Sequence, residues 1–534
     1  KNINSLLINA FKALKEKKNV EAKNLLEKAL LINPNIFETN HNLAILNFRS
    51  GDIDASIPYF EKAKQINPKS SEVHFNLALA FDKKKETNLA IINFQKTIEL
   101  DPNNALAFYN LGYLYKAIFE TIKAEEYLKK SLYLKPNFIL AFHELFGLYD
   151  QSNQLDKYSE LLNKAQKALS EKNLISFYSG IHQYNKKNYQ KAIKILENLN
   201  FDEKNIIQNI TKHGILAKSY DRIKKFDKAF YFFKSNNDLV KNYYGKNINE
   251  NFFINYVNQR IKFFKDFEVN KWKQHSIKNE FTDPIFLIGF PRSGTTLLDT
   301  ILRTNKSVEV LEEKPILRNF LIKLEKKTKN DFNQLYNLNQ EYMQKMHNFY
   351  FQEREKYQKN KKNKIVIDKL PLNIIHIGEI LRFFPNAKFV FALRHPYDSV
   401  LSCFMQQFTL NPAMKNFLSL ESSAALYDLV MKLWTIYREA FSINCHIIKY
   451  EDVVTNFEKT TKKIFKYLDL DWSDETKNFY LTAKNRIDIS TPSYNQVTSP
   501  LYLKSISRWK NYEKQFIDVK KYLDKWVNQF NYKI

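Results

Sequence analysis

The stretch FLIGFPRSGTTLL, residues 286–298, predicts a short apolar strand, a tight turn and an apolar helix. With four residues between Gly289 and Gly294, it nearly matches the phosphate-binding pattern G-x-x-x-x-G-K-[ST], whose lysine reaches the β- and γ-phosphates of a nucleotide. Here Thr295 stands at the lysine position and Arg292 lies inside the turn. The stretch therefore predicts an anion site that works without that lysine.

Apolar segments alternate with helical segments from about residue 281 onward, which indicates a parallel sheet with right-handed crossovers. Ligands of such sheets bind at the carboxyl ends of the strands. Polar residues follow each expected strand: the turn after Gly289, then Lys369, Arg394 and Tyr450. The four expected strands lie within PIFLIGF (284–290), KIVIDK (364–369), AKFVFALRH (387–395) and CHIIKYED (445–452).

The first half of the chain carries an internal repeat of 34 residues. A proline ends an amphipathic helix once per period, and small residues alternate with large ones where two helices must approach. This pattern resembles the tetratricopeptide repeat, and about seven repeats are expected, the last around residues 216–233 after a shift of three residues. Stacked repeats form a concave groove, which predicts either a site for a peptide or protein partner or a bare helical array. The positions are Pro34, Pro68, Pro102 and Pro136, small Ala44, Ala78 and Gly112, and large Phe60, Phe94 and Leu128.

Ordered motifs in the second half resemble the sulfotransferases that use 3′-phosphoadenosine 5′-phosphosulfate (PAPS). The closest pattern is the tyrosylprotein sulfotransferase-like branch, and bacterial sulfotransferases with tetratricopeptide arrays have the same layout. The resemblance covers about residues 281–512. Its motifs are PRSGTT (291–296), LRHPYDSVLS (393–402), KYED (449–452) and the terminal RW (508–509).

The expected fold is therefore multidomain. An all-α tetratricopeptide solenoid is predicted over residues 1–250 and a helical connector over 251–280. A P-loop-like α/β sulfotransferase domain with a parallel sheet is predicted over 281–534. A long insertion, residues 320–364, has aromatic residues at helical spacing and predicts amphipathic helices on the acceptor side.

The resemblance implies PAPS as sulfuryl donor, its desulfated form PAP as product, and no metal. Backbone amides at a helix N-terminus suit the phosphosulfate, with an arginine and hydroxyl groups beside them. Gln406 stands where the family has a second arginine for the 3′-phosphate, which puts the affinity for that phosphate in question. The implied donor residues are Arg292, Ser293, Gly294, Thr295 and Thr296 for the phosphosulfate, Arg394 and Ser402 for the 3′-phosphate, and Tyr450 and Arg508 lining the cofactor.

The resemblance also implies three catalytic residues. Glu313 is the candidate general base, with Glu312 as the adjacent alternative. Lys369 would stabilise charge on the bridging oxygen, and Ser493 would assist Lys369. Other sulfotransferases use a histidine as the base. In this chain His376 and His395 are expected to serve in packing instead.

The 534 residues carry a formal net charge of +26, which favours anionic partners without identifying them. No apolar run is long enough to span a bilayer and no apolar signal core is evident. The two cysteines, Cys403 and Cys445, lie in apolar segments and are expected to be reduced and buried, so a cytoplasmic location is expected.

Three functions fit these observations to different degrees. A PAPS-dependent sulfotransferase whose repeats recruit the acceptor or a partner fits best. A scaffold that keeps the fold without activity is the alternative, and a nucleic-acid binder is not expected because no such motif is present. Peptide tyrosine, a saccharide, a lipid or a small alcohol would each suit the acceptor site.

Overall fold

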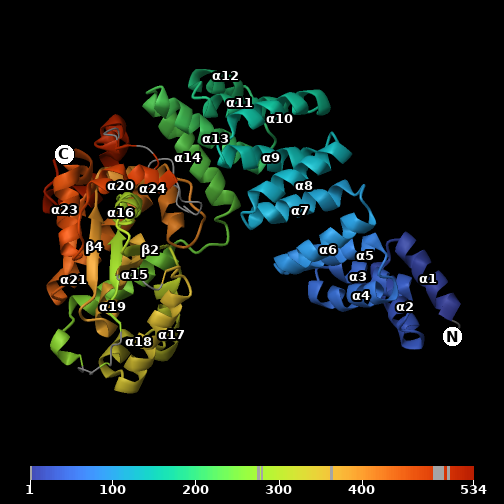
Figure 1. Ribbon diagram of the computed structural model, residues 1–534, viewed down its shortest axis with the longest axis horizontal. Helices are drawn as coiled ribbons and strands as arrows, with labels where there is room; N and C mark the ends of the chain where they lie inside the picture. The colour runs from blue at the N-terminus through green and yellow to red at the C-terminus, as the bar shows by residue number, and fades with distance from the viewer. Residues whose placement is uncertain are drawn as a thin grey trace. The chain divides into compact units, whose positions relative to one another are not determined.

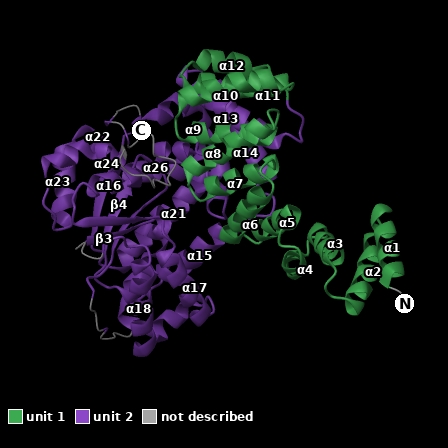
Figure 2. Ribbon diagram, turned by 45° about the vertical axis from the view of Figure 1, so that its right-hand side comes forward, with its two compact units in different colours: residues 1–200 green, residues 201–534 purple. Residues whose placement is uncertain are grey.

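The computed structural model describes residues 3–272, 277, 281–360, 365–484, 498, 500–501 and 505–533. The chain divides into two compact units, Lys1–Asn200 and Phe201–Ile534, which Figure 2 draws in different colours. The predicted domain boundaries at residues 250 and 280 stay predictions. The first compact unit ends at residue 200, so the helices between 206 and 243 belong to the second unit.

The first unit consists, in its described residues, of helices paired into successive antiparallel hairpins (Figure 1). Close packing in one of these hairpins requires a small residue at position 112. A Cβ at Gly112 would lie 2.5 Å from Cγ of Leu128. The helices are α1 (Ile3–Lys15), α2 (Asn19–Ile32), α3 (Phe37–Arg49), α4 (Ile53–Ile66), α5 (Ser71–Lys83), α6 (Thr87–Leu100), α7 (Ala105–Ala117), α8 (Thr121–Leu134), α9 (Ile139–Gln151), α10 (Leu155–Ala168), α11 (Lys172–Asn185) and α12 (Tyr189–Glu197).

The turn inside each hairpin holds one residue in the left-handed region, and these residues recur every 34 positions. The repeat phase therefore continues beyond Pro136, where the helix-ending prolines stop. The next such residue, Lys224, comes three residues late, as the predicted shift requires. The series is Lys17, Gly51, Lys85, Phe119, Asn153 and Lys187.

The second unit begins with helices and continues as a parallel sheet, whose order is β2-β3-β1-β4-β5 in the part of the chain that the structure describes (Figure 1). The strands are β1 (Ile285–Gly289), β2 (Val308–Glu312), β3 (Ile365–Lys369), β4 (Lys388–Leu393) and β5 (Cys445–Lys449). The helices before and between the strands are α13 (Ile206–Arg222), α14 (Phe226–Tyr243), α15 (Asn251–Lys265), η1 (Val269–Lys271), α16 (Thr295–Leu302), α17 (Ile316–Thr328), η2 (Phe332–Asn337), α18 (Gln340–Glu355), η3 (Pro371–His376), α19 (Ile377–Phe383), α20 (Pro396–Phe404), η4 (Met414–Leu418) and α21 (Leu420–Ala440). After the sheet come α22 (Tyr450–Thr455), α23 (Phe457–Tyr467), η5 (Asp474–Asn478), α24 (Phe479–Lys484), η7 (Arg508–Val519) and α26 (Lys520–Gln529).

Both faces of the sheet are covered, and alternate side chains of β1 serve the two faces. Ile285 and Leu287 join a buried cluster with apolar residues of α16, α22 and α23. Phe286 points the other way, stacking on Phe389 at 5.7 Å between ring centroids and meeting Tyr350 of α18 at 6.0 Å. Continuous burial of β1 agrees with its unbroken apolar sequence.

The predicted fold class, a helical repeat region followed by an α/β domain with a parallel sheet, is confirmed. The insertion is helical as predicted, since it forms α17, η2 and α18. The edge strand β2 was not predicted, because two glutamates within it and a third directly after it interrupt the apolar pattern. Two of them, Glu309 and Glu312, are nevertheless buried in the sheet edge. Of the helices that the structure describes, none has the length and hydropathy needed to cross a membrane.

Candidate functional site

All strands of the described sheet run in the same direction, so their carboxyl ends share one edge. Strand β1 lies between β3 and β4. The segment after β1 is therefore flanked by Lys369 at the end of β3 and by Arg394 directly after β4. The predicted grouping of polar residues from separate strands at one edge is found, and Glu312 of β2 extends it.

The segment PRSGTT (291–296), called here the PRSGTT turn, connects β1 to α16 through two left-handed residues. The backbone φ is 67° at Arg292 and 98° at Gly294. Glycine tolerates this region, whereas an arginine in it is uncommon and costs conformational energy. The turn ends where α16 begins at Thr295, so its backbone amides stand at a helix N-terminus, where anions are favoured.

Two glycines let neighbouring groups approach the PRSGTT turn closely. A Cβ at Gly289 would lie 2.6 Å from the carbonyl oxygen of Ala392, and one at Gly294 would lie 2.8 Å from the ring of Tyr450. The hydroxyl of Ser293 is buried and has no hydrogen-bond partner among the described residues. A narrow backbone cradle with an unsatisfied hydroxyl suits an anionic ligand such as the phosphosulfate of PAPS.

Three predicted donor residues contact one another beside the turn. The Nε of Arg292 donates to Oγ of Ser402 at 3.1 Å, and Nη1 of Arg394 donates to the carbonyl oxygen of Arg292 at 3.1 Å. The Arg394 guanidinium also lies 5.0 Å from the ring centroid of Tyr450. Buried Nε of Arg394 has no hydrogen-bond partner among the residues that the structure describes. Arg292, Arg394 and Ser402 thus lie together beside the turn, and the binding of a 3′-phosphate by Arg394 and Ser402 stays a prediction.

Gln406 contributes no charge to this cluster. Its Nε2 donates to the backbone oxygen of Gln407 at 3.1 Å. The side chain therefore bonds locally, beyond the C-terminal end of α20, and the family's second arginine has no charged counterpart at this position.

Lys369 is fully buried beside two glutamates, Glu312 at the end of β2 and Glu313 directly after it. Its Nζ lies 3.0 Å from Oε1 of Glu312 and 3.4 Å from Oε1 of Glu313. The side chain of Glu312 is 5% exposed, whereas that of Glu313 is 40% exposed. A φ of 51° at Glu313 ends the strand, and its N–H donates to the carbonyl oxygen of Lys369 at 2.8 Å. The two adjacent glutamates therefore differ in solvent access, a difference that the sequence pair EE does not reveal.

The segment around Arg508 is anchored by a residue that sequence reasoning missed. Asp398, buried in the first turn of α20, accepts hydrogen bonds from the backbone N–H groups of Ser507 at 2.8 Å and Trp509 at 2.9 Å. An acidic residue in a helix's first turn was the available signal. Arg508 itself forms an ion pair with Asp221 of α13, at 2.9 Å. Ser493 lies outside the described residues, so its predicted role stays a prediction.

His376 and His395 both serve in packing, as predicted. His376 lies 3.4 Å from Glu379, and His395 stacks on Trp509 at 5.5 Å between ring centroids. Burial lowers the pKa of each imidazole. Across the described ranges, no three His, Cys, Asp or Glu side chains gather as metal ligands would.

Both cysteines are unpaired, Cys403 buried and Cys445 half-buried. Burial raises the pKa of the Cys445 thiol to about 12 and that of Cys403 further, so neither thiol is activated as a nucleophile.

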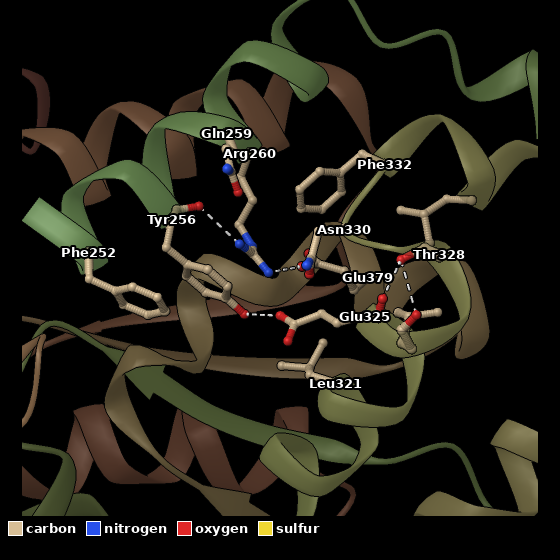
Figure 3. A pocket seen from close by; sticks show the side chains of 12 residues that line it. Phe252, Tyr256, Gln259, Arg260, Leu321, Glu325, Thr328, Asn330, Phe332 and Glu379 are labelled. Atoms are coloured by element: carbon tan, nitrogen blue, oxygen red, sulfur yellow. Dashed lines mark hydrogen bonds and ion pairs between the residues drawn. The ribbon is translucent and has the colours of Figure 1, made fainter.

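A separate cavity of about 290 Å³ lies between α15, α17 and α19 (Figure 3). At its centre the Arg260 guanidinium forms an ion pair with Glu379 at 2.6 Å, and it lies 3.7 Å from the ring centroid of Tyr256. The Tyr256 hydroxyl donates to Glu325 of α17 at 2.8 Å. None of the described donor or catalytic candidates lines this cavity, and its polar contacts join α15 to the helices that follow β2 and β3.

The fold and the strand-end residues define a helical-repeat region followed by a parallel α/β unit with a tight turn between its first strand and helix. Both parts of the chain match known protein families. Residues 284–474 match the Sulfotransferase family, and residues 37–70, 71–104 and 93–126 match the Tetratricopeptide repeat. The chain therefore carries tetratricopeptide repeats followed by a sulfotransferase-family domain.

Two curated relatives share part of the chain. A Protein-tyrosine sulfotransferase of Drosophila melanogaster is 26% identical over 244 residues, which cover 42% of this chain and 46% of the relative. An uncharacterized protein of Aquifex aeolicus (strain VF5) is 25% identical over 313 residues, which cover 57% of this chain and 40% of the relative. This chain thus spans less than half the length of either relative.

Solved structures of repeat proteins are also similar to part of the chain. A crystal structure of MamA is 26% identical with a TM-score of 0.29, covering 30% of this chain and 93% of MamA. A tetratricopeptide repeat protein from Parabacteroides merdae is 15% identical with a TM-score of 0.35, covering 44% of this chain and 93% of that protein.

Proposed function

We propose that residues 281–534 transfer a sulfuryl group from PAPS to an acceptor hydroxyl, and that the repeats, assigned to residues 1–250 with a connector over 251–280, recruit the acceptor or a partner. One observation carries the proposal. At a single sheet edge, the PRSGTT turn lies between a buried lysine, Lys369, and a buried arginine, Arg394. Arg394 on one side and Lys369, which pairs with Glu312 and Glu313, on the other would flank a bound anion without the lysine of a nucleotide triphosphate site.

The donor residues divide by the part of PAPS that each would hold. Arg292, with Ser293 and the amides that open α16, would bind the phosphosulfate. Arg394 and Ser402 would bind the 3′-phosphate, with Tyr450 against the turn. PAPS supplies an activated sulfuryl group on a phosphate leaving group. The unsatisfied Ser293 hydroxyl and Arg394 Nε support this assignment, because buried polar atoms without partners are rare in folded proteins.

Glu313 and Lys369 would carry the chemistry. As the acceptor oxygen attacks sulfur, its proton passes to the Glu313 carboxylate. The bond from sulfur to the bridging oxygen breaks with its electron pair on that oxygen, and Lys369 stabilises the charge that develops there. The exposure of Glu313 supports its role as base, because an acceptor must reach it, whereas Glu312 is closed off.

Peptide tyrosine is the acceptor we propose to test first. The Drosophila melanogaster relative, by its name, acts on protein tyrosine, and the chain's +26 charge suits an acidic peptide. A saccharide, a lipid or a small alcohol would replace it if peptides fail. The two unpaired thiols support the proposed cytoplasmic location.

The test is a thermal-shift titration of the full chain with PAP, ADP and ATP. A ligand at about 100 times its Kd stabilises the native state by about 2.7 kcal/mol. We expect PAP to raise Tm well above ADP and ATP, and Arg394→Ala to abolish the difference. Arg438→Ala, at an exposed position near the C-terminal end of α21, is the matched control and should leave the titration unchanged.

Two outcomes would replace the proposal. Equal shifts with ADP and ATP would mean that the site does not read the 3′-phosphate. No shift with any nucleotide would favour the alternative, an inactive scaffold that binds protein partners through its repeats. If PAP binds as expected, the next assay measures sulfuryl transfer from PAPS to an acidic peptide that contains tyrosine. The control is the same peptide with phenylalanine in place of the tyrosine.

A further inference from the structure

The C-terminal segment that carries Arg508 is fixed beside the donor residues at several points. Nη2 of Arg394 donates to the carbonyl oxygen of Ser505 at 2.7 Å. Asp398 accepts from the backbone N–H groups of the residues on either side of Arg508, at 2.8 and 2.9 Å. The backbone of Arg508 is thus held against the start of α20, a few residues from the end of β4.

The Arg508 side chain is oriented by a carboxylate from a distant part of the sequence. Oδ2 of Asp221, near the end of α13, lies 2.9 Å from Nη2 of Arg508. Oδ1 of the same carboxylate accepts a hydrogen bond from the hydroxyl of Tyr512 at 2.6 Å. The Arg508 side chain keeps 33% of its surface exposed, while Asp221 keeps 14%. One edge of the guanidinium is therefore fixed, and the side chain still has access to a ligand.

Charge interactions agree with this geometry. Burial lowers the pKa of Arg508, but Asp221, Tyr512 and Asp398 together raise it by more, so the net shift is upward. The guanidinium is thus charged, and the contact with Asp221 at 2.9 Å holds its plane.

The hairpin α13–α14 that supplies Asp221 is docked on the other donor element as well. Nδ2 of Asn237 donates to the carbonyl oxygen of Phe404 at 2.9 Å, at the end of α20. Nε2 of Gln407 donates to Oδ1 of Asn236 at 3.1 Å. Because α20 also carries Ser402, the hairpin contacts both the helix and the C-terminal segment that contribute to the proposed donor site.

We infer that Asp221 is a positioning residue for the donor site: it orients Arg508 so that this guanidinium binds PAPS beside Arg394. The inference rests on the proposed function. Part of donor binding is then assigned to α13, a helix whose sequence follows the repeat pattern. The donor site also gains a third oriented guanidinium, that of Arg508, which matters because Gln406 brings no charge. Asp221 itself contacts neither sulfur nor acceptor.

A purely structural role for Asp221 makes different predictions. If the ion pair only ties α13 to the C-terminal segment, its loss lowers Tm and leaves nucleotide affinity unchanged. If Asp221 orients Arg508, its loss weakens binding of PAP and raises the KM for PAPS while kcat at saturating PAPS stays the same. The effect must also vanish once Arg508 is absent.

The experiment measures PAP affinity by calorimetry and PAPS kinetics on the full chain for five proteins: the parent, Asp221→Asn, Arg508→Ala, the double variant, and Asp227→Asn. Asp227 is the matched control, because it is also an aspartate of this hairpin that accepts a hydrogen bond from the C-terminal segment, from Gln515 at 3.1 Å, without touching Arg508. We expect Asp221→Asn to raise the Kd of PAP and the KM of PAPS about tenfold, with kcat within about twofold. The double variant should bind no more weakly than Arg508→Ala, and Asp227→Asn should match the parent.

Several results would overturn the inference. If Asp221→Asn binds PAP as the parent does, or if its effect adds fully to that of Arg508→Ala, Asp221 does not act through Arg508. If the parent binds no 3′-phosphorylated nucleotide, the proposed function fails and this inference with it, an outcome distinct from the first two. Asp221→Ser, which keeps an acceptor for Tyr512 without the charge, replaces Asp221→Asn if that variant does not fold, with the same expected changes.

Discussion

Replacing Glu313 and Glu312 by glutamine, one at a time, should show which residue serves catalysis and which serves stability. Glu313 is 40% exposed, so Glu313→Gln is expected to change the free energy of unfolding by about 0.5 kcal/mol or less. It removes the proposed base, and loss of general base catalysis lowers kcat by about 10²- to 10⁴-fold. The protein should thus remain folded, bind PAP normally and lose activity.

Glu312→Gln should have the reverse effect. Lys369 is 0% exposed, and Glu312 is its nearer carboxylate at 3.0 Å. Breaking a buried ion pair on one side costs about 3–5 kcal/mol, and the lower end applies because Glu313 remains at 3.4 Å. We expect an apparent Tm lower by about 5 °C or more, with the chemical step reduced less than in Glu313→Gln.

The two variants are compared by calorimetric melting, by PAP titration and by single-turnover transfer from PAPS. Single-turnover rates report the chemical step apart from product release. The assignment would be refuted if Glu312→Gln kept its Tm and lost activity while Glu313→Gln remained active. Equal loss of stability in both variants would show that the difference in burial does not separate their roles.

Three further predictions follow from the turn and from buried charges. Gly294→Ala should weaken PAP binding by about tenfold or more, because φ is 98° there and a Cβ would lie 2.8 Å from the Tyr450 ring. PAP titration checks this prediction, and an unchanged Kd would show that the turn adapts to the side chain. Burial raises the pKa of Glu379, but Arg260 and His376 together lower it by more, to about 2 against an ordinary 4.5, so about 3 kcal/mol of stability present above pH 4.5 should be lost as the pH falls toward 2. Urea unfolding between pH 5 and 3 should show this loss in the parent and a flatter profile in Glu379→Gln. Burial raises the pKa of Asp368 to about 7 against an ordinary 3.8, so the parent should lose about 1.4 kcal/mol per pH unit relative to Asp368→Asn between about pH 4 and 7, with a constant difference above pH 7. Unfolding curves of both proteins from pH 4 to 8 test this, and an unchanged difference across that range would contradict it.

Local sequence signals were sufficient for much of the fold. Strands β1, β3, β4 and β5 are short apolar runs with polar residues directly after them. Burial on both faces of the sheet requires such runs in β1, β3 and β4, whereas the edge strand β5 is only partly buried. The repeat phase followed from residues spaced 34 apart, because each hairpin repeats the same close approach between helices. Strand β2 escaped prediction because Glu309 and Glu312 look like surface residues until their buried partners are known. Glu309 accepts from the backbone N–H groups of residues 359 and 360, at 2.6 and 3.2 Å.

The candidate site was predictable only in part, for a related reason. Motifs identify residues that follow strands, so Arg292, Lys369 and Arg394 could be named from the sequence. Orientation comes from contacts between distant segments, and no local pattern encodes these. Asp221 meets Arg508 across 287 positions of sequence, the difference between their numbers. Asp398 likewise holds backbone amides 109 and 111 residues away.

The two glutamates beside Lys369 suggest how one lysine can serve a site that lacks the usual phosphate-loop lysine. A buried ammonium without a partner tends to lose its proton, since burial disfavours charge. Glu312, closed to solvent and 3.0 Å from the Lys369 ammonium nitrogen, is the buried partner of this lysine. Glu313, more distant at 3.4 Å and open to solvent, is then available to accept the acceptor's proton. On this reasoning the neutral variant Glu312→Gln should lower kcat as well as stability, because Lys369 would then pair only with Glu313, the residue that must also act as base.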